Sequence, residues 1–398
     1  MRKTCDIALI NCTSETFTPT ASGALSTWIW EVCQAAAHDG VQPLVITREA
    51  PSAPWPWQRT RFIEYPYPKR LLRVRGAGRL FNIQREIMGW GHPHFGAYAK
   101  RVVEALKYER LESGVLVLQN DVELAAHLRA ALPRAMIVHL SQNDLVIAEK
   151  YRRKFTASVD VPLAVSDYCA RYSGAYFGIP VGTLYNGVNP TTFAPAAEIV
   201  RGPPIINFVG RMQSVKGPDL LLRAALALAR KGLRFGIQML GTKHFDRHEV
   251  DEFNRSLSLA AGELQSMGIA VRMAGHVPRA GLPAELCRAQ INCVPSRWRE
   301  PFGLTTLEGM ACGLATVASN TGGTPEVVGD AGLLFERENV EQLAGHLERL
   351  ITDENLRRDY AVRARQRALN FTWAKTWTSL FGAINGEAAG GRRGVDGA

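Results

Sequence analysis

The sequence lacks the patterns that would point to metal, disulfide or membrane chemistry. Its seven cysteines contain no CxxC pair and its nine histidines no HExxH motif, so we expect neither a zinc site nor a disulfide framework. No apolar run reaches the roughly 20 residues of a membrane-spanning helix. The opening segment MRKTCDIALINCTSE turns polar too early for a signal peptide. We therefore expect a cytoplasmic protein with reduced cysteines.

Charge is the most uneven feature of the composition. The 398 residues carry a net charge of +10, and the stretch from Arg59 to Arg110 holds twelve Lys or Arg against four acids, with aromatics between them. Such a stretch can meet nucleic acid, an anionic membrane surface or an acidic substrate, or it can be a solvated basic face. Because the sequence has no nucleic-acid-binding motif, we favour an anionic membrane surface, with the protein peripheral at its inner face.

Short apolar runs alternate with longer helical patterns, which predicts an α/β protein. The runs lack polar alternation, as parallel strands covered on both faces do. We expect strands at 6–11, 43–47, 114–118, 135–140, 162–166, 205–210, 235–240, 269–275, 291–295, 314–319 and 332–335. Helices fill the gaps, and one helical region covers 339–382. Two such halves, joined near 187–204, predict two doubly wound domains, and the glycine-rich 386–398 is expected to be a disordered tail.

The segment REPFGLTTLEGMACG, residues 299–313, is the main candidate site. It follows the strand at 291–295, and Gly303 leads into a helix whose first amides, around Leu304 and Thr305, have no partners within the helix. Such amides form an anion site. Glu300 in the loop and Glu308 one turn into the helix could bracket one ligand. Alternatively, Glu308 complements its helix dipole and Glu300 is solvated.

Two cations follow another strand of the same half. In VGRMQSVKGPDLL, Arg211 and Lys216 stand between the strand at 205–210 and a helix. An arginine fork and a lysine point charge in such a loop can grip a pyrophosphate. Because both loops follow strands of one predicted sheet, the cations and the carboxylates are expected at the same edge.

These segments resemble those of a known family. EPFGLTTLEGMACGLATVASNTGGTPEVV is similar to the donor-site signature of retaining GT-B glycosyltransferases of family 4, the glycosyl transferases group 1. VGRMQSVKGPDLLLRAA resembles its G-R-x4-K-G segment, and PLAVSDYCARYSGAYFGIPVGTLYNGVNPTTFAP its interdomain signature. Asn189 replaces the acidic residue that the family has after NGV. The resemblance covers nearly the whole chain.

The resemblance implies a GT-B fold, with two Rossmann-like domains facing each other across a deep cleft. Residues 1–190 would form the acceptor-binding domain and 191–371 the nucleotide-sugar domain. A C-terminal helix at about 372–385 would pack back on the first domain. The partners implied are a nucleotide-sugar donor, with a UDP-sugar favoured, and a hydroxyl acceptor such as a glycan, a lipid-linked sugar or a small molecule.

The resemblance also implies roles for single residues in the donor half. Arg211 and Lys216 would bind the donor diphosphate, Glu308 the ribose, and Glu300 the donor sugar. The remaining donor-loop positions would lie beside these groups, with Thr305 near the phosphate: Phe302, Gly303, Leu304 and Thr305.

In the first half, the resemblance assigns three residues. His139 matches a histidine that follows the strand AMIVHL and would lie near the donor sugar. Ser22 and Gly23 occupy the loop after the first strand, where the family often has Gly-Gly and TASGAL keeps only the second glycine.

The activity implied is that of a metal-independent hexosyltransferase that retains the anomeric configuration, with cell-envelope glycan or glycolipid synthesis as one setting. The acceptor attacks from the leaving-group face and the departing diphosphate takes its proton; no cofactor is expected. A glycosidase-like carboxylate pair fits the neighbouring cations less well. A nucleotide-sugar epimerase on the same fold and a non-catalytic nucleotide-sugar-binding protein stay open as alternatives.

Overall fold

The computed structural model describes residues 6–19, 23–50, 52–64, 93–147, 149–196, 202–242 and 252–386. The chain divides into two compact units. Unit 1 comprises residues 1–185 and 374–398, and unit 2 comprises residues 186–373. The division falls a few residues before the boundary at 190 that the sequence predicts. Most of the basic, aromatic stretch, the residue Ser22 and the tail from 387 onward lie outside the described residues.

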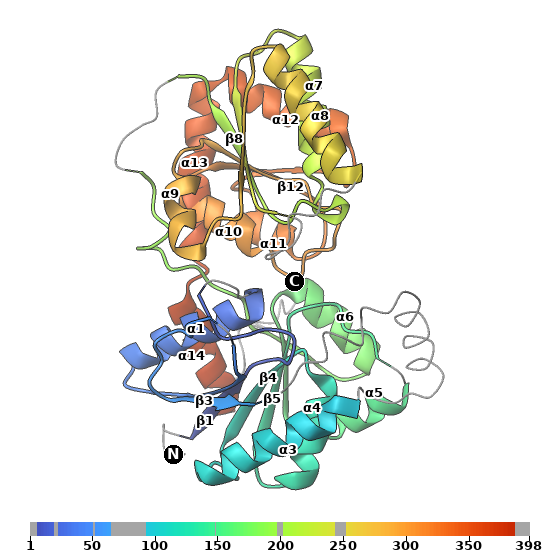
Figure 1. The fold of residues 1–398 in the computed structure, drawn as a ribbon, viewed down its shortest axis with the longest axis vertical. Helices are drawn as coiled ribbons and strands as arrows, with labels where there is room; N and C mark the ends of the chain where they lie inside the picture. Colours follow the sequence, from blue (N-terminus) through green and yellow to red (C-terminus); the bar gives the residue numbers. More distant parts are fainter. Residues whose placement is uncertain are drawn as a thin grey trace, which may run out of the picture. The chain divides into compact units, whose positions relative to one another are not determined.

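Unit 1 is built on a parallel sheet with the strand order β3-β2-β1-β4-β5-β6-β7 (Figure 1). The chain runs outward from β1 in one direction and then from β4 in the other, which is the doubly wound pattern. The strands are β1 (Ile7–Ile10), β2 (Leu44–Arg48), β3 (Thr60–Ile63), β4 (Val115–Gln119), β5 (Met136–Ser141), β6 (Val161–Ala164) and β7 (Gly182–Thr183).

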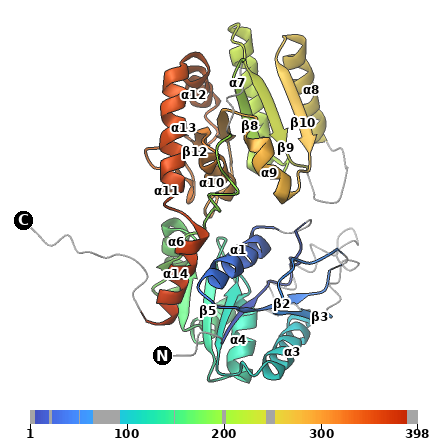
Figure 2. The ribbon, with the colours of Figure 1, turned by 90° about the vertical axis from the view of Figure 1, so that its left-hand side faces the viewer.

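Helices cover the sheet of unit 1. They are α1 (Ala24–His38), α3 (Pro93–Tyr108), α4 (Val122–Ala131), α5 (Glu149–Thr156), α6 (Asp167–Phe177) and α14 (Trp373–Ile384). One core lies between the sheet and α3, α4 and α5, with Tyr98, Leu128 and Phe155 among its buried members. The last helix packs in this unit: Trp377 Nε1 donates to Asp39 Oδ2 at 2.8 Å, so α14 adjoins the end of α1 (Figure 2).

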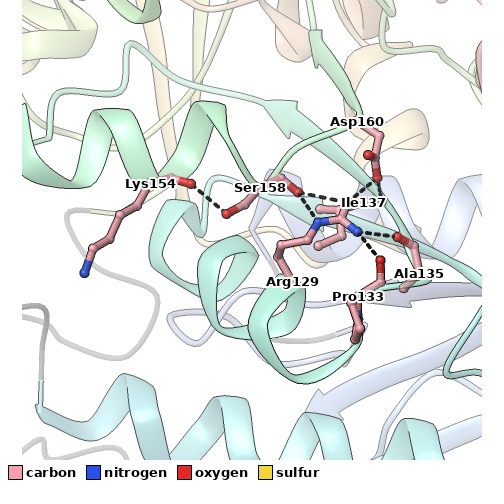
Figure 3. Close-up of polar contacts among 7 residues, drawn as sticks. All are labelled: Arg129, Pro133, Ala135, Ile137, Lys154, Ser158 and Asp160. Carbon is pink, nitrogen blue, oxygen red and sulfur yellow. Dashed lines mark hydrogen bonds and ion pairs between the residues drawn. The ribbon is translucent and has the colours of Figure 1, made fainter.

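A polar network ties together the starts of β5 and β6 (Figure 3). Arg129, on α4, donates to the carbonyl oxygens of Pro133, Ala135 and Ser158 at 2.9 to 3.2 Å. It also pairs with Asp160, whose Oδ2 accepts the Ile137 N–H at 2.7 Å. Because one side chain satisfies several loop carbonyls, the network fixes the edge of the sheet opposite to the strand ends that carry the candidate residues.

Unit 2 has a parallel sheet with the order β10-β9-β8-β11-β12-β13. Its strands are β8 (Ile205–Val209), β9 (Gly236–Leu240), β10 (Ala270–Gly275), β11 (Ile291–Val294), β12 (Ala315–Ser319) and β13 (Leu333–Phe335). Its helices are α7 (Pro218–Arg230), α8 (Glu252–Ser266), α9 (Leu282–Leu286), α10 (Leu304–Ala311), α11 (Thr324–Val328), α12 (Val340–Thr352) and α13 (Glu354–Ala368), with short 3-10 turns at Ser214–Lys216 and Arg279–Gly281.

The core of unit 2 lies between its sheet and the apolar faces of α7, α8 and α12. On α7, the segment PDLLLRAALALAR buries leucines and alanines at helical spacing, such as Leu221, Ala225 and Leu228, as an amphipathic helix does. The helices α10 and α13 pack against each other. Both sheets are parallel and helix-covered, so the predicted pair of Rossmann-like domains is confirmed.

The structure corrects several details of the predicted elements. The region 339–382, predicted as helical, contains three helices, because Asp353 begins α13 by accepting the Leu356 N–H and a turn at 369–372 precedes α14. The strand β3, the helix α5 and the helix α11 were not predicted, since each is short and weakly periodic. Among the described residues, no helix is both long and apolar enough to cross a membrane.

Candidate active site

The candidate residues of unit 2 gather at the point where the strand order reverses. The central strands β8 and β11 are neighbours, and the chain winds outward from each in opposite directions. Loops that leave such a pair diverge and open a crevice at the carboxyl ends of the strands, where ligands of doubly wound folds bind. The loop after β8 carries Arg211 and Lys216, and the loop after β11 carries Glu300.

These two loops are in backbone contact. The amides of Arg297 and Trp298 both donate to the Val215 carbonyl at 2.9 Å. Gly217 has a φ of +69°, and a Cβ at this position would lie 1.9 Å from the Pro295 carbonyl oxygen. Only glycine combines this left-handed backbone with so close an approach, so Gly217 allows the loops to pack against each other.

Lys216 and Glu300 form an ion pair across the two loops. Lys216 Nζ lies 2.6 Å from Glu300 Oε1, and the side chains are 23% and 13% exposed. Ser296 Oγ donates to the same carboxylate oxygen at 2.8 Å. The pair places a cation and a carboxylate at the strand ends, so the predicted proximity of the two loops is present in the structure.

The loop after β12 supports Glu300 from its backbone side. The Gly323 N–H donates to the Glu300 carbonyl at 2.7 Å. Gly322 has a φ of +60°, and a Cβ there would lie 2.2 Å from that same oxygen. The TGG sequence after β12 is therefore what lets this loop close over the Glu300 backbone, a role that was not assigned from the sequence.

The helix α10 begins directly after Gly303. Gly303 has a φ of +98°, which admits glycine and disfavours other residues. The side chains of Leu304 and Thr305, in the first turn, are partly exposed, whereas Thr306 is buried and its Oγ1 has no hydrogen-bond partner among the described residues. The free amides of this first turn are a site of positive potential. Phe302, just before them, is buried against Phe371.

Glu308 is a buried carboxylate with a cationic partner that the sequence did not suggest. Its side chain is only 3% exposed, and Arg279 Nη1 lies 2.7 Å from Glu308 Oε1. Burying an unpaired carboxylate is strongly unfavourable. The ion pair with Arg279 therefore explains how the Glu308 charge can be buried. The alternative in which Glu308 only complements its own helix dipole is therefore not the whole explanation.

Arg211 differs from Lys216 in its surroundings. Its side chain is exposed, and no side-chain hydrogen bond or ion pair involves it within the described part of the chain. It follows β8 directly, as the sequence predicts, and adds a cation to the same edge of the sheet.

In unit 1, Gly23 immediately precedes α1 and is held by the half-buried carboxylate of Glu15. The amides of Gly23 and Ser26 donate to Glu15 Oε2 at 3.1 and 2.9 Å. A Cβ on Gly23 would lie 2.1 Å from Glu15 Oε1, and burial raises the pKa of the Glu15 carboxyl. Glu15 thus shapes the loop after β1, and it was not singled out from the sequence.

His139 lies within β5, near the end of the strand that the sequence predicts at 135–140. Pairing of Ser141 with Ala164 extends the strand beyond His139. The imidazole is 1% exposed, packs edge-on against Phe155 at 4.7 Å, and its Nε2 has no partner among the described residues. Burial lowers the pKa of His139 to about 3, so the ring is neutral at physiological pH.

A further acid lies at the same edge of unit 1. Asp121 follows β4 and accepts the Thr13 N–H at 3.3 Å, and burial raises the pKa of Asp121 to about 7.

Asn189, the position that departs from the family pattern, caps the turn after it: its Oδ1 accepts the amides of Thr191 and Thr192 at 3.0 and 3.2 Å. Asparagine therefore performs the capping that an aspartate would perform.

The chain is similar in sequence to known proteins. The family model of glycosyl transferases group 1 matches residues 191–367, within unit 2. A D-inositol 3-phosphate glycosyltransferase of Thermobifida fusca is 31% identical over 279 residues, covering 65% of this chain and 63% of that protein. One from Salinispora arenicola is 35% identical over 46% of this chain and 41% of its own length. The chain thus spans less than two thirds of these relatives.

Solved structures are similar over nearly the entire chain. Sucrose-phosphate synthase from Thermosynechococcus elongatus aligns with a TM-score of 0.73 and 19% identity, covering 96% of this chain and 98% of its own. HepE from Anabaena, in complex with UDP and glucose, aligns with a TM-score of 0.69 and 16% identity, covering 96% and 99%. At such identities the likeness establishes the fold. The chain therefore has the GT-B fold of two Rossmann-like domains, and its residues 191–367 are similar to the glycosyl transferases group 1.

Proposed function

We propose that this protein is a glycosyltransferase that takes a sugar from a nucleotide diphosphate sugar. The observation that carries the proposal is the pair of carboxylates at the strand ends of unit 2, each held by a cation: Glu300 by Lys216 at 2.6 Å and Glu308 by Arg279 at 2.7 Å. A nucleotide sugar needs anion-binding groups for its diphosphate and acceptors for its hydroxyls, and this edge of the sheet holds both.

The diphosphate would be bound by the loop after β8 and the start of α10. Lys216 supplies a point charge, the exposed Arg211 a planar fork, and the amides of Leu304 and Thr305 the positive end of a helix. When Lys216 turns from Glu300 to the phosphate, the Glu300 carboxylate is released to accept hydrogen bonds. The same groups stabilise the charge that develops on the leaving diphosphate.

The two carboxylates would then accept hydrogen bonds from different hydroxyl groups of the donor. Glu308, one turn into α10, accepts from the ribose, and Glu300, in the loop before Gly303, accepts from the sugar being transferred. The glycine at 303 lets the backbone near Phe302 approach the ligand. This assignment follows the family resemblance, and the burial of Glu308 and the accessibility of the Glu300 loop support it.

The reaction we propose retains the anomeric configuration. The bond from the anomeric carbon to the diphosphate oxygen breaks, the acceptor oxygen attacks from the same face, and the leaving diphosphate takes the acceptor proton. The roles that the family resemblance gives to His139 and Gly23, both in unit 1, stay predictions. We further propose that no metal takes part, which activity in excess EDTA would test.

A UDP-sugar is the donor we favour, because the structural neighbour HepE binds UDP and glucose. For the acceptor, we propose a lipid-linked or anionic hydroxyl compound at the cytoplasmic face of a membrane, on the strength of the basic segment between Arg59 and Arg110. Sedimentation with anionic vesicles at low salt would test this; a protein left in the supernatant would contradict it.

The central experiment measures UDP release from a panel of UDP-sugars with mixed hydroxyl acceptors. Lys216→Ala and Glu308→Ala should each lower the rate by at least about 100-fold, as loss of transition-state charge stabilisation does. Lys231→Ala is the matched control, because it removes a Lys–Glu ion pair of the same unit, to Glu348, away from the strand ends.

Three outcomes would count against the proposal. Full activity in Lys216→Ala or Glu308→Ala would remove the assigned roles. An epimerised UDP-sugar formed without an acceptor would show an epimerase instead. Binding of UDP-sugars with no turnover across the whole panel would show a binding protein. In an active enzyme, NMR of the product's anomeric centre distinguishes retention from inversion.

A further inference from the structure

The buried Glu308 carboxylate depends on its cationic partner, Arg279. Glu308 lies on α10, whereas Arg279 begins the 3-10 turn Arg279–Gly281 that follows β10. The sheet places β10 at its edge and β11 near its centre, so the contact joins two distant loops of unit 2. Nothing in the spacing of the two residues along the chain predicts it.

Arg279 itself is held in a defined position. Its guanidinium carbon lies 5.4 Å from the centre of the Phe193 ring, a cation–π geometry. The Phe193 ring is buried, and the Phe193 carbonyl accepts from Arg365 Nη1 at 2.7 Å. The Arg279 side chain is 24% exposed. Its head group is therefore fixed between an anchored aromatic ring and the buried carboxylate.

The ion pair leaves one side of the carboxylate open. Arg279 Nη1 reaches Glu308 Oε1, and no hydrogen bond to Oε2 occurs among the described residues. An ionised carboxylate has acceptor capacity on both oxygens. With Oε1 anchored, Oε2 is held in a single orientation and remains able to accept hydrogen bonds from a ligand.

We propose that Arg279 is a positioning residue that keeps the Glu308 carboxylate oriented for the vicinal hydroxyls of the nucleotide ribose. This inference rests on the proposed function, because it assumes that Glu308 accepts from a ribose. Arg279 acts through Glu308: without it, the carboxylate would be a buried unpaired charge, which the site would relieve by rotating it toward water. That rotation removes the acceptor that the hydroxyls need.

The proposal predicts a loss of affinity that depends on the ribose hydroxyls. Binding of UDP, ADP and GDP to the full chain by calorimetry first identifies the nucleotide that wild type binds. With that nucleotide, Arg279→Ala should weaken binding by about ten-fold, the scale of one charge-assisted hydrogen bond. Binding of its 2′,3′-dideoxy analogue should change by less than about two-fold, because that analogue offers nothing to Glu308.

Companion variants separate positioning from folding. Glu308→Gln should show the same hydroxyl-dependent loss, and the Arg279→Ala and Glu308→Gln double variant should bind no more weakly than either single one, since both remove one interaction. Arg279→Lys keeps the charge but not the fork, so it should recover part of the affinity and serves if the alanine variant does not fold. Arg272→Ala, which removes the Arg272–Glu285 ion pair of the same unit, should leave both affinities unchanged.

The outcomes are distinguishable. Wild type that binds none of the three nucleotides would overturn the proposed function, and this inference with it. Wild type that binds a nucleotide whose affinity is unchanged in Arg279→Ala would overturn the inference alone. Equal weakening of the ribonucleotide and its dideoxy analogue would also overturn it, because Arg279 would then act on the base, the phosphates or the fold rather than through Glu308.

Discussion

Replacing Gly217 by alanine tests whether the contact between two loops sets the geometry of the Lys216–Glu300 pair. Gly217 follows Lys216 directly and has a φ of +69°; an added Cβ would lie 1.9 Å from the Pro295 carbonyl oxygen and 2.9 Å from its carbon. Both atoms belong to backbone at the end of β11, so neither can rotate away. The loop that carries Lys216 must therefore move away from the loop that carries Glu300.

The structure sets the size of the effect. Real Cβ atoms essentially never come within 3.0 Å of another atom, so the two loops must separate by about 1 Å to accommodate the methyl group. The left-handed backbone adds about 1–2 kcal/mol for any residue other than glycine. A misplacement of about 1 Å can lower a rate about 100-fold. We expect a loss of that order in transfer, together with a measurable loss of stability.

Gly232→Ala provides the matched control. Gly232 ends the turn after α7 with a φ of +80°, but a Cβ there meets nothing within 4 Å. It therefore carries the same backbone penalty without the collision. The assay compares thermal unfolding and UDP release for wild type and both variants. If Gly217→Ala and Gly232→Ala have the same activity, the loop contact does not control the site and the reasoning is refuted.

Three further predictions concern the rest of the molecule. Burial raises the pKa of Asp121 to about 7, above its unfolded value of about 3.9, so ionising it makes stability fall as the pH rises from about 4 to about 7. Urea unfolding should therefore show Asp121→Asn to be more stable than wild type at pH 8, by up to about 4 kcal/mol, and nearly equal to it at pH 4. Burial lowers the pKa of His139 to about 3. The neutral ring therefore contributes fully to the free energy of unfolding above about pH 6.5, and this contribution is lost as the pH falls toward 3. NMR should show a neutral His139 ring at pH 5, and a protonated ring at that pH would contradict its burial. Arg129→Ala should lower the free energy of unfolding by about 2–3 kcal/mol, because it leaves several carbonyl groups and Asp160 without their partner. Nucleotide affinity in calorimetry should stay unchanged, since Arg129 belongs to unit 1; a matching loss of affinity would contradict a purely structural role for this network.

The sequence alone was sufficient to predict which residues the donor loops contain. The positions of Glu300, Gly303 and Glu308 along a loop and helix follow from local spacing, because one chain segment contains all three. The placement of Lys216 at the same edge followed from the rule that parallel strands end together. These predictions need only periodicity and topology, which a single sequence contains.

The partners of these residues could not be predicted in the same way. Glu308 pairs with Arg279, which follows an edge strand, and Glu15 holds the Gly23 loop from within the same irregular segment. No periodic pattern marks either contact, because each depends on how loops turn in space. The burial of the His139 ring likewise depends on packing against Phe155 of α5, a helix that was not predicted.

By itself, the sequence determined the two doubly wound domains and the segment that carries the two glutamates, because hydrophobic periodicity and glycine placement act locally along the chain. Only the tertiary structure decided which charges meet. Lys216 is 84 positions from Glu300 along the chain, and Arg279 is 29 from Glu308. Such pairs form where strands end at a common edge and glycines let their loops touch. The physical reason is that an ion pair depends on distances of a few ångströms, which are set by the packing of the sheet and not by separation along the chain.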